Sequence, residues 1–341
     1  MPTDRARKLL VIFAMLSSVL GLTACGGGGG YGGGNNNPSG AGPSKLFAAD
    51  STDRVIGSLA NPNPAAGSLT VDRAIGPMSP YFYNYAMFST NLGSLALDTT
   101  RDYLYVGNGT SILVFHGASV ANGDLSTNAT IGPIGNTGSM FLDAANDRLY
   151  VGDDVNNVKV FSPASTASSM STPRLVTGMT TPIHGVAVDA ANNILYVSNE
   201  NSTTHQISVF DNADAVTNAA PSRTITPTVS TVNQPVGGIS VDATRNLLYV
   251  APGSGNGIMV FTTASAANGA IPPAKTLTIT PAPGILKVVV DAVNDRLYAV
   301  GSNGHIYLVE AASTLSTGAV TAKDASLSNG GMLTAVAVNP N

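Results

Sequence analysis

The sequence of 341 residues has one cysteine, no tryptophan and few charged side chains. A single cysteine excludes a disulfide-stapled scaffold and a zinc site built from cysteines. Charged residues make up 11% of the chain, less than half of the share of about 25% in typical globular proteins. This scarcity argues against charge-rich disorder and long salt-bridged helices. The net charge of −4 argues against nucleic-acid binding, which requires a basic surface.

The N-terminus has the pattern of an export signal. Arg5, Arg7 and Lys8 precede 16 mostly apolar residues, Leu9 to Ala24, a run too short to span a membrane comfortably. The end of this run, Leu22-Thr23-Ala24-Cys25, resembles the bacterial lipoprotein signal. The resemblance implies cleavage before Cys25, acylation of Cys25 and, because Gly follows, delivery to the outer membrane. An ordinary secretory signal with a chance cysteine is the alternative.

A low-complexity stretch follows the lipidation site. Eight of the nine residues 26–34 are Gly, and Asn, Pro, Ser and Gly dominate from there to Ser44. Such a composition cannot bury a core and predicts a flexible tether. The expected organisation is a lipoprotein signal peptide in residues 1–24, the lipidated cysteine and tether in 25–44, and one folded domain in 45–341.

The folded domain repeats a single unit. Each copy has an apolar residue followed by Asp, then Asp or Asn four positions later, then Leu-Tyr-Val or a close variant. An alternating apolar run such as Ile112–Phe115 comes next, which predicts a strand. With two further short extended segments, the unit has four strands, as expected for a β-propeller blade of about 50 residues. Five copies begin at Leu97, Leu142, Val188, Val241 and Val290.

The two ends of the domain supply a sixth copy. Val336–Asn341 is the beginning of a unit, and Lys45–Ala48 and Asp53–Ile56 match its continuation. The prediction is an all-β, six-bladed β-propeller of four-stranded antiparallel blades, closed by pairing of the N- and C-terminal strands, which removes free sheet edges. An open β-solenoid is the alternative, but it gives no reason to split one unit between the termini.

The repeats resemble the NHL and YVTN type of bacterial β-propeller repeat in their Leu-Tyr-Val and Ile-x-Val-Phe patterns. The resemblance covers residues 45–341 and implies the fold. Because such repeats serve enzymes, binding proteins and scaffolds, it does not specify a function.

The position of a residue within the unit predicts the face on which it lies. Turns between first and second strands face one side, where the paired Asp and Asn side chains are expected to fix the hairpin rather than bind calcium. The other side surrounds the mouth of the central channel, where His184 is expected as a wall residue or a ligand contact. The first residues of the innermost strands are expected to line this mouth and are apolar or small: Leu92, Thr137, Ile183, Val236, Ile285 and Leu333.

Oxygen-bearing side chains follow several of the second strands on the channel side. Oxygen ligands suit a hard divalent cation, and gluconolactonase-like propellers hold a metal in this way. Capping of the turns is the alternative role. The candidate metal ligands are Asp50, Asp153, Asp154, Asn199 and Glu200.

Residues 79–91 form an unusually long loop that is rich in aromatic side chains. Rings give a large contact area at low entropic cost, so this loop is a candidate ligand-binding surface. Packing over apolar surface between blades is the alternative. The candidate binding residues are Tyr81, Phe82, Tyr83, Tyr85 and Phe88.

Together these patterns predict an exported, lipid-anchored propeller in the cell envelope, periplasmic or surface-facing. We expect a non-catalytic binding or scaffold role with a protein, peptide or glycan partner at the channel face, membrane contact through the lipid alone, no nucleic acid and no cofactor. The alternative is a metal-dependent hydrolase or lyase of the lactonase-like propeller class, which would use a divalent cation.

Overall fold

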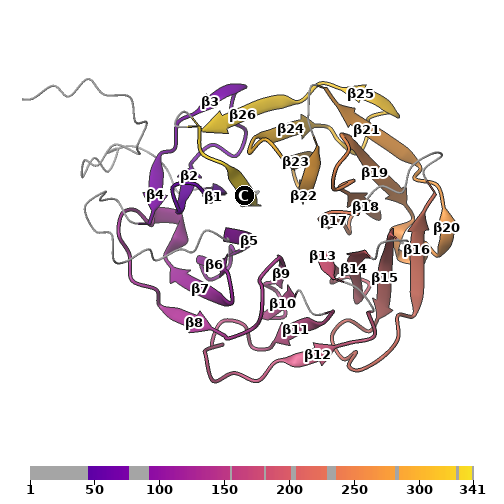
Figure 1. Cartoon of the computed structure of the whole chain (residues 1–341), viewed down its shortest axis with the longest axis horizontal. Helices are drawn as coiled ribbons and strands as arrows, with labels where there is room; N and C mark the ends of the chain where they lie inside the picture. The colour runs from indigo at the N-terminus through magenta and orange to yellow at the C-terminus, as the bar shows by residue number, and fades with distance from the viewer. Residues whose placement is uncertain are drawn as a thin grey trace, which may run out of the picture.

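The computed structural model describes residues 45–76, 92–153, 156–179, 182–200, 205–228, 236–280, 284–327 and 330–339. These residues form six β-sheets arranged as the blades of a closed ring (Figure 1). The predicted β-propeller is therefore confirmed. The helical content of the described ranges is two short 3₁₀ turns, η1 (Ala118–Val120) and η2 (Ala264–Ala266), and neither is long and apolar enough to cross a membrane.

We number the blades from 1 to 6 around the ring and give their strands from the channel outward. Blade 1 contains β27 (Leu333–Val338), β1 (Leu46–Asp50), β2 (Val55–Leu59) and β4 (Arg73–Ile75). Blade 2 contains β5 (Leu92–Asp98), β6 (Tyr103–Asn108), β7 (Ser111–His116) and β8 (Ala129–Ile131). Blade 3 contains β9 (Ser139–Asp143), β10 (Arg148–Gly152), β11 (Val158–Phe161) and β12 (Arg174–Val176).

The second half of the ring follows the same plan. Blade 4 contains β13 (Ile183–Asp189), β14 (Ile194–Glu200), β15 (His205–Asp211) and β16 (Arg223–Pro227). Blade 5 contains β17 (Ile239–Asp242), β18 (Leu247–Val250), β19 (Gly257–Thr262) and β21 (Lys275–Ile279). Blade 6 contains β22 (Ile285–Asp291), β23 (Arg296–Gly301), β24 (Ile306–Glu310) and β26 (Lys323–Leu327).

The hydrophobic core lies between neighbouring blades. Six clusters of buried side chains each draw on two adjacent blades, so that every interface in the ring has its own core. Tyrosines of the Leu-Tyr-Val segments are fully buried in these layers, because alternate strand positions face the next blade. They are Tyr105, Tyr150, Tyr196, Tyr249 and Tyr298.

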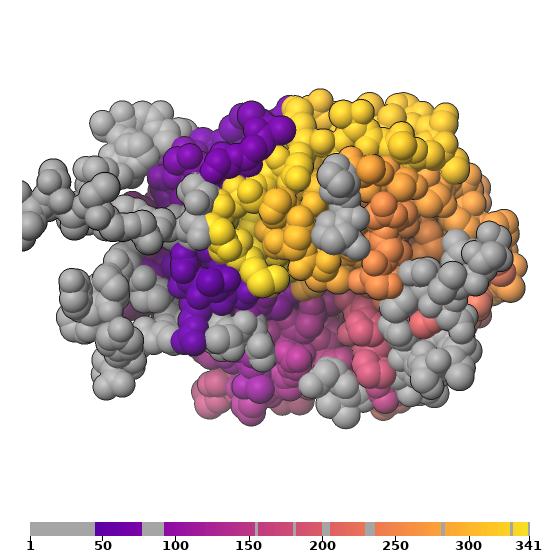
Figure 2. All heavy atoms as spheres, turned by 45° about the horizontal axis from the view of Figure 1, so that its top comes forward, coloured from indigo at the N-terminus to yellow at the C-terminus, as the bar shows by residue number. Residues whose placement is uncertain are grey.

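The ring closes in blade 1 as predicted. The C-terminal strand β27 pairs antiparallel with β1, with Leu46 opposite Val338 and Phe47 opposite Ala337. Figure 2 shows the last residues of the described chain, in yellow, beside the first, in indigo. Backbone hydrogen bonds thus join the two ends of the domain and leave no open edge at the seam.

Three blades carry a fifth, outer strand that the repeat pattern did not predict. The strands β20 (Gly269–Ile271), β25 (Gly318–Val320) and β3 (Gly67–Leu69) pair parallel with the outermost strands of the preceding blades, β16, β21 and β26 (Figure 1). Each comes from the loop before the fourth strand of the next blade, so these sheets have five strands and are mixed. The extra strands join neighbouring blades at the rim.

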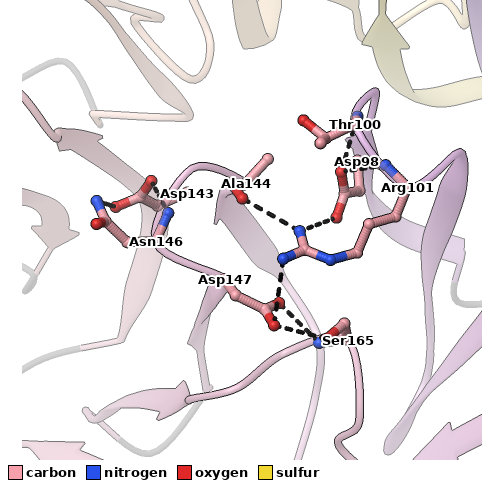
Figure 3. A network of polar contacts seen from close by, with 8 residues as sticks. All are labelled: Asp98, Thr100, Arg101, Asp143, Ala144, Asn146, Asp147 and Ser165. Carbon is pink, nitrogen blue, oxygen red and sulfur yellow. Dashed lines mark hydrogen bonds and ion pairs between the residues drawn. The ribbon is translucent and has the colours of Figure 1, made fainter.

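The paired Asp and Asn residues fix the turns between first and second strands. Asp98 Oδ1 accepts hydrogen bonds from the amides of Thr100 (2.9 Å) and Arg101 (3.0 Å). The side chain of Arg101 contacts Asp98 (2.9 Å), the carbonyl of Ala144 (3.2 Å) and Asp147 (3.5 Å) in blade 3 (Figure 3). The capping role is confirmed, and in this pair of blades it extends into an inter-blade contact.

Candidate binding channel

A cavity of about 250 Å³ lies on the axis of the ring. It is lined by the innermost strands of all six blades, β5, β9, β13, β17, β22 and β27. Most of the lining is apolar or small, which is typical of a ligand pocket with few orienting polar groups. The cavity is the candidate binding site among the residues that the structure describes.

The residues expected to line the channel mouth do not do so. The six positions from Leu92 to Leu333 are all buried, with exposed fractions of 6% or less, and none of them lines the cavity. Register shifts interrupt the pairing of β5, β13, β22 and β27 at this end. These irregularities change the direction of the side chains, so that the residues one or two positions later face the channel.

The corrected alignment reveals one residue that stands out. At the position two residues after each buried one, five blades have a small side chain: Ser94, Ser139, Gly185, Gly238 and Ala335. The sixth blade has Lys287, which lines the cavity. The sequence contains this signal, because aligning the starts of the innermost strands places the lysine among glycine, serine and alanine.

Lys287 spans the channel. Its strand β22 belongs to blade 6, and its ammonium donates to the carbonyl of Gly93 in blade 2 and to that of Gly138 (3.3 Å) in blade 3, which is opposite. Its stem passes close to blade 5, since a Cβ atom on Gly238 would lie 3.2 Å from Lys287 Cβ and Cγ. Burial lowers the pKa of Lys287 to about 8, because a low-dielectric environment disfavours the charged form.

His184 also lines the cavity, and its side chain is exposed. It lies in β13 of blade 4, at the register shift between Ile183 and Gly185. The structure therefore places this candidate residue on the channel wall, together with Lys287. A role in ligand binding stays a prediction.

Hydrogen bonds near the cavity hold the blades together. Each of the six blade interfaces has such a bond, and five of the six bonds involve a hydroxyl group. The bonds are Thr334 Oγ1 to Leu92 O (2.7 Å), Ser94 Oγ to Thr137 O (3.0 Å), Val186 N to Ser139 Oγ (2.9 Å), Ser198 Oγ to Gly237 O (2.7 Å), Val290 N to Ser240 Oγ (3.1 Å) and Leu333 N to Gly304 O (3.1 Å).

Three of the candidate metal ligands are described, and each is held locally. Asp50 Oδ1 accepts from the amides of Thr52 (2.8 Å) and Asp53 (3.3 Å). Asp153 accepts from the amide of Asn157 (2.8 Å) and forms an ion pair with Lys159 (3.0 Å). Asn199 Oδ1 accepts from the hydroxyl of Ser208 (3.0 Å). The three side chains are buried and belong to blades 1, 3 and 4.

The described part of the chain contains no group of three or more His, Cys, Asp or Glu residues placed to hold a metal ion. Asp154 and the side chain of Glu200 lie outside the described residues, as do Cys25 and the five aromatic candidates, Tyr81, Phe82, Tyr83, Tyr85 and Phe88. The loop that carries the aromatic residues joins β4, at the outside of blade 1, to β5, at the channel.

Comparison with known proteins supports the fold and does not extend to a family. No family model matches this chain, and no curated protein matches it. A solved structure described as "Crystal structure of Nidogen/Laminin Complex" is similar over 86% of this chain and 97% of that chain, with a TM-score of 0.58 and 15% sequence identity. At this identity the similarity shows the β-propeller fold alone.

Proposed function

We propose that this chain is an exported, lipid-anchored β-propeller of the NHL/YVTN type that binds a protein, peptide or glycan at its channel mouth without catalysis. The observation that carries the proposal is the axial cavity, to which all six blades contribute. Hydrogen bonds across every blade interface hold its walls in place before a ligand arrives, and such preorganisation lowers the entropic cost of binding.

Two further observations support a binding role. The segment with the aromatic residues Tyr81, Phe82 and Tyr83 directly precedes the innermost strand β5 in the sequence, and Lys287 donates to the carbonyl of Gly93 in that strand. The similar propeller structure comes from a complex of two proteins. We therefore propose that the aromatic side chains form the outer part of the ligand site and the channel its inner part.

The proposal can be tested by measuring binding of the full chain to glycan and peptide arrays. Replacing Tyr81, Phe82 and Tyr83 by serine is expected to weaken binding at least about tenfold, because aromatic anchors dominate the energy of most interfaces. A matched control replaces Val120 and Val293, exposed hydrophobic residues in turns of the opposite face, by serine and keeps full binding.

Two outcomes would contradict the proposal. Binding that survives in the aromatic variant and is lost in the control variant would place the ligand site on the opposite face. Conversion of an array ligand into a product, detected by mass spectrometry, would favour the hydrolase or lyase alternative.

A further inference from the structure

Small residues in the other five blades leave space in the channel for the side chain of Lys287. The equivalent residues of the other five blades are Gly, Ser or Ala, so the ring has room for one long side chain. The lysine crosses this space and ends at carbonyl groups of blades 2 and 3. A charged side chain at the centre of a ring of small residues is not needed for packing, since five blades pack without one.

The charge of Lys287 is not balanced by the walls of the cavity. Of the described residues that line the cavity, none is Asp, Glu or Arg, and the one lysine is Lys287. Its two acceptors are neutral carbonyls. Removing an ammonium group from water without an anionic partner is costly, and its lowered pKa follows from the same imbalance. The cavity thus favours an incoming negative charge.

We propose that the channel mouth binds a carboxylate group, which accepts a hydrogen bond from the ammonium of Lys287. This inference rests on the proposed role of the channel as a binding site. An ammonium has three N–H donors, and the described residues provide two acceptors, so one donor is available to the ligand. His184 lines the same cavity, so a bound acid would also lie near its side chain.

The size and charge of the site define the ligand more closely. One ammonium balances a single negative charge, whereas phosphate sites combine a lysine or arginine with further donors, such as clusters of backbone amides. A cavity of about 250 Å³ is slightly smaller than the 300–1,000 Å³ of pockets for whole drug-sized molecules. The cavity has room for a small carboxylic acid, or for the acidic end of a longer ligand whose remainder stays outside the channel.

The test is titration of the full chain with matched pairs of acidic and neutral probes. N-acetylglycine is compared with N-acetylglycinamide, and galacturonate with galactose, by calorimetry and thermal shift in low-salt buffer. We expect the acids to bind and their neutral partners to fail. The stronger of the two acids then identifies the carboxylate as that of a peptide terminus or of an acidic sugar.

Variants assign the binding to Lys287. Lys287→Met is expected to weaken binding of the acid at least about tenfold, the effect of losing a charged hydrogen bond. Lys275→Met is the matched control, because Lys275 also donates to a backbone carbonyl, that of Ser313 (2.7 Å), but lies outside the cavity. If Lys287→Met fails to fold, a pH titration of the wild-type protein still tests the site. Binding of the acid should weaken as the pH rises through about 8, because the ammonium of Lys287 then loses its charge.

Equal binding of acidic and neutral probes, or unchanged binding by Lys287→Met, would overturn the carboxylate site. A ligand from the arrays that depends on Tyr81, Phe82 and Tyr83 but not on Lys287, and that the acids do not displace, would leave the proposed binding function intact and refute the carboxylate site alone.

Discussion

At the scale of single residues, the paired Asp and Asn side chains of the repeat hold two turns of their blade. Asp98 accepts hydrogen bonds from amides of its own turn, between the first and second strands. Asp102, with φ of 59°, accepts from the amide (2.8 Å) and hydroxyl (2.7 Å) of Ser119, in the turn between the third and fourth strands. Lys287 stands out when the starts of the innermost strands are aligned, but the sequence pattern does not show that register shifts turn this position toward the channel.

The capping network predicts how the turns respond to substitution. Asp102→Ala should lower the free energy of unfolding by about 1–3 kcal/mol, because it leaves the Ser119 amide without its acceptor and puts a Cβ-bearing residue without a polar side chain at positive φ. Asp102→Asn should cost much less, since Asn193 and Asn246 occupy the same position in blades 4 and 5. Urea denaturation measures both, and equal losses would contradict the capping account.

The pKa of Lys287 predicts a dependence of stability on pH. The lysine has a pKa of about 8 in the folded protein and an ordinary value of 10.5. Between these values the unfolded chain binds more protons, so this group makes the free energy of unfolding rise with pH. Relative to Lys287→Met, the wild type should gain about 1–2 kcal/mol between about pH 7 and pH 9.5.

Above about pH 9.5, the absolute stability of both proteins is expected to fall, because tyrosines act in the opposite direction. Burial raises the pKa of Tyr298 to about 12, and that of Tyr150 also rises, so the fold loses stability as these groups ionise in the unfolded chain. If the free energy of unfolding changes with pH in the same way in wild type and Lys287→Met, Lys287 has an ordinary pKa and the prediction is wrong.

At the scale of strands, alternation of apolar residues was sufficient for the inner four strands of each blade and insufficient for the outer ones. The strand β6 buries four of its six residues, and repetition in five copies removed the ambiguity of short apolar runs. In the three-residue strands β3, β20 and β25, five of the nine residues are exposed. Their pairing comes from the neighbouring blade, which local sequence does not encode.

The closing strand β27 should be essential to the stability of the ring. Deletion of residues 336–341 removes the pairs formed with Leu46, Phe47 and Ala48 and the burial of Val336 and Ala337. We expect a loss of at least about 3 kcal/mol from apolar burial alone, and a clear fall in Tm by calorimetry. A control that lacks only residues 340–341 keeps the hydrogen bond from the Asn339 amide to Lys45 (2.7 Å) and should melt like wild type.

At the scale of the whole molecule, the sequence predicted the architecture through its length, its repeats and the unit divided between its ends. The ligand could not be predicted, because a propeller fold serves many functions and the shape of the channel depends on contacts among six distant segments. The predicted localisation rests on the N-terminal sequence rather than on the fold, and a separate experiment tests it.

Cys25→Ala should release the protein from membranes. Stable anchoring requires more than one acyl chain, and the lipoprotein pattern places all of them on this residue. Fractionation of cells that express the full chain should move the variant from the membrane pellet to the soluble fraction, while binding to array ligands is unchanged. A variant that still sediments with membranes would contradict the lipid anchor.

The seam in blade 1 also has a consequence for the time at which the protein matures. Of the strands in the ring, β1 and β2 are synthesised first and β27 last, so the inner edge of β1 has no pairing partner until β27 has been made. A chain that ends before β27 keeps this edge unpaired and is prone to aggregation. Closure of the ring therefore depends on the strand that is made last within it.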